Sequence, residues 1–297
     1  MIELTDEMLI VELRRRMMDN KRSLDELKHL TNELKIVNKK LEESEALKTH
    51  FISNVTNEII NPFTSILGLS KAILSVDKEN WKKVLTMVAL IHSEAFELDF
   101  QLRNIFAAAK IEAGEVFPEI GRVELHTLIG SLIESFAIES KKKKVRFEFQ
   151  FDIQSDEDPF YFKTDPEKLK LIVSNLLGNA MKYSHADSRV IVRVWLQENE
   201  LMVSVQDFGI GVSAEHQRLI FDRFSRVDSG ISSVNRGHGL GLSINKALLD
   251  ILNGEISLTS ELGKGAVFTI RIPEAMEDPF LTATDDNELF FDDKQVF

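Results

Sequence analysis

Residues 175–183 read Asn-Leu-Leu-Gly-Asn-Ala-Met-Lys-Tyr and carry four side chains that suit a nucleotide and its metal ion. If the stretch is helical, Asn175, Asn179 and Lys182 lie four and three residues apart and share one face. An amide oxygen can be a ligand of Mg²⁺, the ammonium of Lys182 can meet phosphate charge, and Tyr183 can pack on a flat base. An ordinary polar helix face has the same pattern, so the stretch alone is only moderately specific.

A glycine-containing turn at Asp207-Phe-Gly209-Ile-Gly211 follows a predicted strand. A buried carboxylate at a strand end can accept a hydrogen bond from an exocyclic amine such as that of adenine. The glycines allow backbone to approach a ligand closely. Taken alone, the motif is equally typical of a turn that simply ends a strand.

A second glycine-rich turn, Gly237-His-Gly239-Leu240-Gly241, opens a predicted helix. Backbone in such a turn can wrap phosphate groups, and the N-terminus of the helix favours anions. The segment before it, 229–236, is polar, rich in Gly and Ser, and without strong periodicity. We expect it to form a flexible lid over a bound nucleotide.

Two phenylalanines and two arginines precede this lid, within residues 220–228. Phe221 and Phe224 are predicted to anchor the lid, and Arg223 and Arg226 to reach the γ-phosphate of a bound nucleotide. Core phenylalanines and surface arginines are the alternative interpretation.

The elements upstream of these motifs are helical. Residues 1 to about 48 contain no Pro or Gly and repeat apolar side chains every seven residues. Seven of ten a and d positions are Ile, Leu or Met, which fits a two-stranded coiled coil whose polar seam residues, Asn20 and Asn38, would fix register. A lone surface helix is the alternative, and the length of the repeat disfavours it. The seam positions are Ile10, Leu13, Met17, Asn20, Leu24, Leu27, Thr31, Leu34, Asn38 and Leu41.

The same phase continues to about residue 75, and a second amphipathic helix runs from about residue 81 to Gly114. Two such helices form an antiparallel hairpin that cannot bury both of its faces alone. Two hairpins paired as a homodimer would make a four-helix bundle.

From Val123 onward, short strands alternate with helices. This order predicts an α+β fold in which helices cover one face of a mostly antiparallel sheet. Strands are expected at Val123–Leu125, Val145–Ile153, Val190–Leu196, Leu201–Gln206, 255–260 and 266–272, and helices at His126–Ser140, Asp165–Tyr183 and 240–252.

These motifs, in this order and after a helical hairpin, resemble the N, G1, F and G2 boxes of sensor histidine kinases, whose ATP-binding domain is of the Bergerat type found in the GHKL superfamily. The resemblance covers roughly residues 46–273. It implies ATP and Mg²⁺ as cofactors, with Asn179 holding Mg²⁺ and Asp207 reading adenine. Related GHKL ATPases have a glutamate base where Asn175 stands, so the resemblance implies phosphoryl transfer rather than hydrolysis.

The stretch from Phe51 to Pro62 resembles the family's histidine box but departs from it at one position. The family pattern runs from Phe to Ser or Thr, the phospho-accepting His, an acid, a base, Thr or Asn, and Pro. Here the matching positions hold Phe51, Thr56, Asn57, Glu58, Ile60, Asn61 and Pro62. The phospho-accepting histidine is absent, and Asn57 stands in its place.

An amide nitrogen is delocalised and not nucleophilic, so we expect autophosphorylation at Asn57 to be lost. A natural loss and an engineered replacement both remain open. His50 is a weaker candidate acceptor, because no acid follows it. Glu58 and Asn61 match the family's spacing for positioning water against a phospho-aspartate, which implies that phosphatase activity toward a response regulator is retained.

Composition sets the broad class. The chain has 297 residues, 43% of them apolar and 28% charged, which is typical of globular domains. A formal charge of −12 argues against nucleic-acid binding. No apolar run reaches the length of a membrane span, and there is no cysteine, so we expect a soluble, cytoplasmic chain.

The predicted organisation has five parts: a coiled-coil helix, a dimerisation and phosphotransfer-like hairpin, a linker, an ATP-binding domain and an acidic, disordered tail. The expected function is the histidine-kinase core of a two-component system, acting with the receiver domain of a response regulator. A non-catalytic pseudokinase that signals as a nucleotide-dependent dimer is the main alternative, and an independent ATPase is a further one. The boundaries are 1–48, 49–114, 115–122, 123–273 and 274–297.

Overall fold

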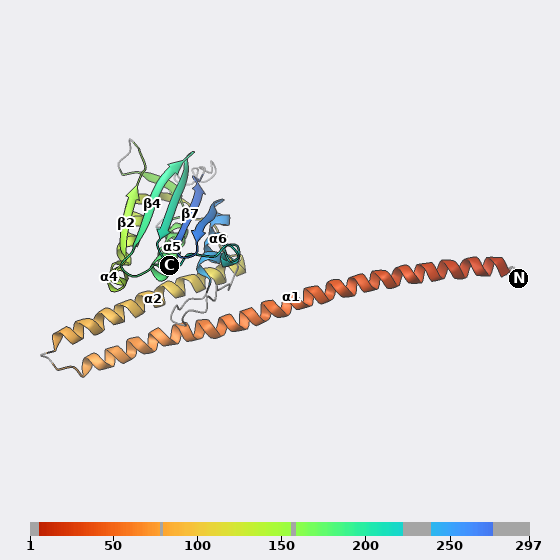
Figure 1. Cartoon of the computed structure of the whole chain (residues 1–297), viewed down its shortest axis with the longest axis horizontal. Coiled ribbons are helices and arrows are strands. Elements are labelled where there is room, and N and C mark those ends of the chain that lie inside the picture. Colours follow the sequence, from red (N-terminus) through yellow and green to blue (C-terminus); the bar gives the residue numbers. More distant parts are fainter. Residues whose placement is uncertain (1–5, 78–79, 156–158, 222–238, 276–297) are drawn as a thin grey trace, which may run out of the picture. The chain divides into compact units, whose positions relative to one another are not determined.

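The computed structural model describes residues 6–77, 80–155, 159–221 and 239–275 (Figure 1). The chain divides into two units, residues 1–56 and 57–297. Within the described residues, no helix is both long and apolar enough to cross a membrane. Nearly all of the predicted acidic tail lies outside the described residues.

The first unit belongs to one helix, α1 (Asp6–Leu74), which continues into the second unit. The predicted seam positions Ile10 and Met17 are 52% and 72% exposed, so one copy of the chain leaves this stripe uncovered. A coiled coil with a second copy would cover it, and this pairing stays a prediction.

The second unit opens with the end of α1, a short connection, and α2 (Trp81–Ala113). Helix α2 ends at Gly114, whose φ of 68° is left-handed and whose N–H bonds back to the carbonyl of Ile111. Glycine adopts this conformation without steric cost, which explains why the helix stops there.

The sheet of the second unit has five strands in the order β2-β4-β5-β7-β6. Only β2 and β4 pair in parallel, and the other three pairs are antiparallel. The mostly antiparallel sheet predicted from the sequence is therefore confirmed. The strands are β2 (Arg146–Phe151), β4 (Arg189–Gln197), β5 (Glu200–Asp207), β6 (Glu255–Glu261) and β7 (Gly265–Pro273).

The core lies between this sheet and its helices. Alternate residues of β5 are buried, beginning with Leu201 and ending with Asp207. Helix α5 (Pro166–Tyr183) presents Leu169, Ile172 and Leu176, all fully buried. Helices α3 (Leu125–Ser135) and α6 (Gly241–Ile251) both contact α5, which completes the mixed helix-and-sheet fold.

Two expectations about local structure were incomplete. The single helix expected at His126–Ser140 is two helices, α3 and α4 (Ala137–Lys143), separated at Phe136. Phe136 is buried, and its ring lies 6.2 Å from that of Phe147 on β2, so the break turns an aromatic side chain onto the sheet. A short strand, β3 (Tyr161–Thr164), pairs with β1 (Gly121–Glu124) and was not anticipated.

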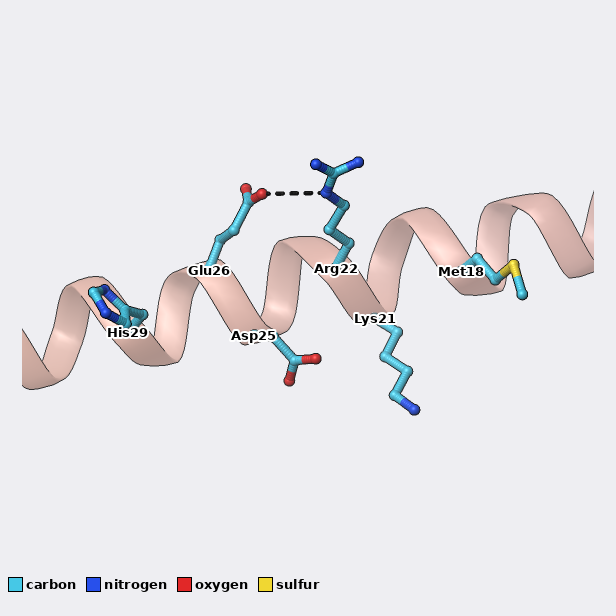
Figure 2. A pocket seen from close by; sticks show the side chains of 6 residues that line it. All are labelled: Met18, Lys21, Arg22, Asp25, Glu26 and His29. Carbon is cyan, nitrogen blue, oxygen red and sulfur yellow. Dashed lines mark ion pairs between the residues drawn. The ribbon is translucent and has the colours of Figure 1, made fainter.

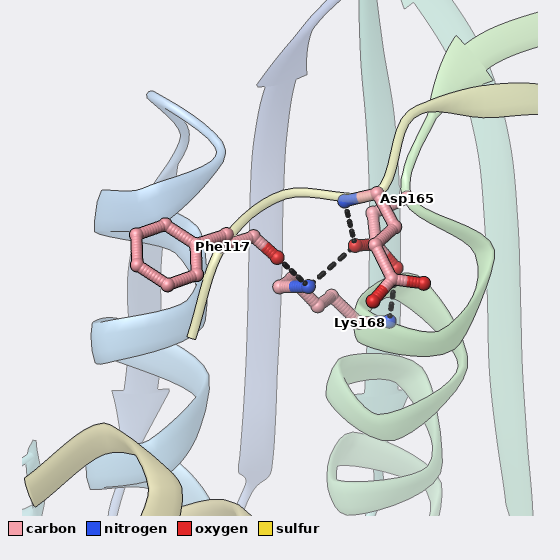
Figure 3. Close-up of polar contacts among 4 residues, drawn as sticks. Phe117, Asp165 and Lys168 are labelled. Atoms are coloured by element: carbon pink, nitrogen blue, oxygen red, sulfur yellow. Dashed lines mark hydrogen bonds and ion pairs between the residues drawn. The ribbon is translucent and has the colours of Figure 1, made fainter. Parts of the chain in front are cut away.

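The start of α5 is fixed to the linker that follows α2 (Figure 3). Asp165 caps the helix by accepting from the Lys168 N–H at 2.9 Å, and it also accepts from the Glu119 N–H at 2.7 Å. The ammonium of Lys168 pairs with Asp165 and donates to the carbonyl of Phe117 at 2.7 Å. In Figure 3 the Lys168 ammonium lies between the carboxylate of Asp165 and the carbonyl of Phe117 and is joined to both.

Burial of Asp165 favours its neutral form, but the bonds from Lys168 and Glu119 outweigh this and lower its pKa. A carboxylate with a lowered pKa stabilises the fold above the pKa of unfolded Asp, and that stability is lost as the pH falls through the folded pKa.

We predict that Lys168→Ala lowers the free energy of unfolding by about 2 kcal/mol at pH 7, because it leaves a buried carboxylate without its cation. Lys170→Ala is the matched control on the same helix. Lys170 also pairs with an acid three residues earlier, Glu167, but that pair is 44% and 69% exposed, against 12% and 2% for Lys168 and Asp165. Urea denaturation should show less than about 0.5 kcal/mol for the control, and equal losses in both variants would contradict the prediction.

Candidate functional site

The end of α5 and the turn after β5 meet closely. Ser184 and Gly209 form an isolated β-bridge, and the Ile210 N–H lies 3.3 Å from the carbonyl of Tyr183. The structure thereby brings together two motifs, Asn175–Tyr183 and Asp207–Gly211, that are separated by more than twenty residues in the sequence.

The glycines of this turn allow backbone segments to pack closely, and their approach to a ligand stays a prediction. A Cβ atom on Gly209 would lie 1.9 Å from the carbonyl oxygen of Tyr183. On Gly211, whose φ is 64°, it would lie 2.1 Å from the carbonyl oxygen of Glu261. Both distances exclude any side chain, so the two glycines let three backbone segments pack around the turn.

Asp207 ends β5 and is 4% exposed. Its Oδ1 accepts from the Gly209 N–H at 3.0 Å, and the Ala266 N–H also bonds to the carboxylate. Burial raises the pKa of Asp207 to about 6, although these bonds and the charges of His185 and Lys143 act in the opposite direction. The side chain is thus a desolvated acceptor, as recognition of an exocyclic amine requires.

Three candidate site residues of α5, Asn175, Asn179 and Lys182, differ in exposure. Asn175 is 1% exposed, and its Nδ2 donates to Oδ1 of Asn245 at 2.8 Å. Asn179 and Lys182 are half-buried, and the Lys182 ammonium lies 5.1 Å from the ring centroid of the exposed Tyr183. Asn175 is therefore packed inside the fold, about one turn from the more accessible Asn179 and two turns from Lys182.

Helix α6 starts at Gly241 with Leu240 as its N-cap, and within the described residues no side-chain hydrogen bond caps this end. Gly239, just before it, has a φ of 66°. An uncapped helix N-terminus after a glycine turn can receive an anion. Phe221 ends a short 3₁₀ helix (Leu219–Phe221) and is half-buried. The remaining predicted lid and phosphate-loop residues, Arg223, Phe224, Arg226 and Gly237, lie outside the described residues.

Two residues of the site were missed by sequence reasoning. Lys143 belongs to the basic run 141–144, and its ammonium donates to the carbonyls of Met181 and Lys182 at 2.6 and 2.7 Å. It lies near Asp207, and burial lowers the pKa of its ammonium. Asn245 is fully buried beside Asn175. Charge pattern and spacing gave no signal for either contact.

The candidate phosphotransfer residues lie on α1. Asn57 and Glu58 belong to this helix, and Asn61 is exposed one residue before the buried Pro62. The structure thus places Asn61 where a partner protein can reach it.

The described residues contain neither a cluster of metal-ligating side chains nor an enclosed groove on α1. Among the described residues, no group of three or more His, Cys, Asp or Glu side chains could hold a metal ion, so a metal here would rely on amide oxygens and the nucleotide. A surface groove on α1 is lined by Met18, Lys21, Arg22, Asp25, Glu26 and His29, all from one helix (Figure 2). Its Arg22–Glu26 ion pair, 3.5 Å long, is an ordinary exposed pair, and the groove offers no enclosure for a ligand.

Comparisons with known proteins identify a family and relatives of this chain. Residues 164–276 match the family described as histidine kinase-, DNA gyrase B- and HSP90-like ATPases. The chain is 30% identical to the circadian input-output histidine kinase CikA of Synechocystis sp. over 77% of this chain and 31% of that protein. It is 30% identical to the sensor protein DivL of Caulobacter vibrioides over 80% of this chain and 29% of that protein.

The chain therefore spans about a third of the length of these curated relatives. Among solved structures, full-length ShkA in complex with AMPPNP has a TM-score of 0.54 and 22% identity, covering 78% of this chain and 46% of that one. At this identity the likeness supports the fold alone.

We predict that Asp207→Asn makes the protein more stable near neutral pH, raising its melting temperature by several degrees. The pKa of Asp207 is higher in the folded state than in the unfolded one. Its contribution to stability is therefore fully present below the pKa of unfolded Asp and is lost as the pH rises through about 6.

Thermal unfolding between pH 4 and 8 measures this effect, and the gain should shrink as the pH falls below 6. Asp250→Asn, at an exposed position on α6, is the control and should show no such dependence. An Asp207→Asn protein that is less stable than wild type at pH 7.5 would refute the raised pKa assigned to Asp207.

Proposed function

We propose that this chain, which is a histidine-kinase core with an ATP-binding domain of the GHKL type, binds Mg·ATP where α5, the end of β5 and the start of α6 meet. The observation that carries the proposal is Asp207, a desolvated carboxylate at a strand end with glycine backbone packed around it. A buried carboxylate of this kind destabilises the ligand-free fold, and a hydrogen bond from an adenine amine would offset that cost.

Different residues of the site are proposed to contact different parts of the nucleotide. Asp207 accepts from the adenine amine, and Tyr183 offers its exposed ring to the base. Lys182 offers its ammonium to the phosphates, and the uncapped start of α6 offers backbone N–H groups.

The metal is assigned to amide oxygens. Asn179 is the proposed ligand. The Oδ1 of Asn175 is a buried acceptor without a hydrogen-bond partner among the described residues, so it is free to accept from water bound to a nearby cation. Bound Mg²⁺ would neutralise charge on the phosphate oxygens during phosphoryl transfer.

The established reaction of the family passes the γ-phosphoryl group to a histidine and then to an aspartate of a response-regulator receiver domain. In this chain, Asn57 occupies the histidine position and offers no nucleophile. We therefore propose that the ATP-binding machinery is retained while autophosphorylation at this position is lost.

A homodimer is proposed as the assembled form. Besides the seam of α1, the apolar side chains of Ile60, Phe63 and Leu67 are each more than half exposed in one copy of the chain. Helices that leave this much apolar surface uncovered are typical of bundles completed by a second chain.

We predict that Asn57→His restores autophosphorylation. Incubated with γ-labelled ATP, the variant should acquire acid-labile label, and the starting protein should acquire none. Asn57→His combined with Asp207→Ala is the control and should lose the label, because the adenine contact is removed.

Label on neither Asn57→His nor the starting protein would contradict the proposal and favour a pseudokinase that signals by conformation. Steady release of labelled phosphate without labelled protein would favour an independent ATPase.

Phosphatase activity toward the regulator is a second candidate, favoured by the exposure of Asn61 three residues after Glu58. We predict that the nucleotide-bound protein speeds decay of a phosphorylated receiver domain at least about tenfold, a loss of barrier near 1.4 kcal/mol. Asn61→Ala should abolish the effect, and Thr64→Ala, an exposed position one turn away, should not. Equal decay with wild type and Asn61→Ala would rule the activity out.

A further inference from the structure

A relay of two buried amides links α5 to α6. The Nδ2 of Asn245 donates to the carbonyl of Ile172 at 3.0 Å, and the Oδ1 of Asn245 accepts from the Nδ2 of Asn175 at 2.8 Å. Asn245 is fully buried and Asn175 nearly so. Buried amides in such a relay are held firmly, because breaking one bond leaves a polar group unpaired.

The direction of this relay is fixed by its starting point. The backbone carbonyl of Ile172 can only accept, so Asn245 must turn its NH₂ toward it. The oxygen of Asn245 then faces Asn175 and can only accept, so Asn175 must present its own NH₂. The remaining proton of that NH₂ is directed at the carbonyl of Gly241, 3.3 Å away.

The Oδ1 of Asn175 is the one atom of these two amides that the relay does not use. It is buried and has no hydrogen-bond partner among the described residues. This oxygen lies 3.6 Å from the place that a Cβ on Gly241 would occupy, beside the first residue of α6. A buried acceptor without a donor is unfavourable, so a donor or cation is expected to reach it in the functional state.

The choice between oxygen and nitrogen at this point has chemical consequences. An amide oxygen attracts a cation or its bound water and repels a phosphate oxygen. An NH₂ group turned to the same place would do the reverse. Whichever residue orients the Asn175 amide therefore decides whether the site favours the nucleotide with its metal or the bare nucleotide.

We propose that Asn245 is a positioning residue that holds the Asn175 amide with its oxygen turned toward the hydrated Mg²⁺ of the bound nucleotide. This inference rests on the proposed binding of Mg·ATP. Asn245 itself is fully enclosed and acts only through Asn175.

Two substitutions separate positioning from simple packing. Asn245→Leu keeps the volume but removes the acceptor, so the Asn175 amide loses its orientation. Asn245→Asp keeps an oxygen for Asn175, and its carboxyl, protonated in this buried place, can also donate to the carbonyl of Ile172. Lys246→Ala, exposed on the same helix, is the control.

The first measurement uses nucleotide-free protein. In ¹⁵N spectra, the side-chain NH₂ of Asn175, identified by its absence in Asn175→Asp, should exchange slowly in wild type and Asn245→Asp and rapidly in Asn245→Leu. Rapid exchange of this assigned signal in wild type would overturn the relay, however the Asn245 variants behave.

The second measurement compares ADP affinity in Mg²⁺ with ADP affinity in EDTA. In Asn245→Leu, the ratio of the ADP affinity in Mg²⁺ to the ADP affinity in EDTA should fall about tenfold, with the affinity in EDTA unchanged. Asn245→Asp and Lys246→Ala should keep the wild-type ratio. A wild-type ratio in Asn245→Leu, or equal losses in the Leu and Asp variants, would overturn the positioning role. Wild type that binds no ADP would overturn the proposed function and the metal contact with it, while the exchange rates would still decide the relay.

Discussion

The close approach of backbone around Asp207 is the constraint on which the rest of this domain depends. The end of α5, the turn after β5 and the hairpin between β6 and β7 meet where a methyl group would not fit, at Gly209, Gly211 and Gly265. Because the three segments are this close, Asp207 loses its water and receives backbone N–H groups from two of them. The close packing of the backbone therefore determines the environment, and with it the chemistry, of the Asp207 carboxylate.

Electrostatic compensation for this buried charge comes from outside the motif. Lys143 reaches across from α4 to the last carbonyls of α5, where the helix dipole is negative, and its charge also acts on Asp207. The ammonium of Lys143 therefore stabilises both the end of α5 and the carboxylate of Asp207. The site depends on a residue that belongs to none of its glycine or asparagine motifs.

The sequence predicted local features well and contacts between distant segments poorly. The start of α5 near Asp165, the end of α2 at Gly114 and the strands β4 and β5 were predicted, because each depends on residues that are neighbours in the chain. The break at Phe136 and the strand β3 were not, since an aromatic contact and a strand partner across the domain decide them. Within the site, Asp207 and Asn179 belong to motifs, whereas Lys143 and Asn245 act across 38 and 70 residues without a local pattern.

The fixed linker at the start of α5 has a mechanical consequence. Helix α2 ends at Gly114, and the chain is held again at Phe117 and Glu119 by Lys168 and Asp165. Only two residues lie between these anchors, a tether of about 7 Å when extended. A domain on so short a tether can rotate about the linker, but the linker allows little displacement away from the end of α2. Helix α5 starts at these anchors, has 18 residues and is about 27 Å long, so a rotation about the tether would move Lys182 and Tyr183 at its far end further than the residues near Asp165.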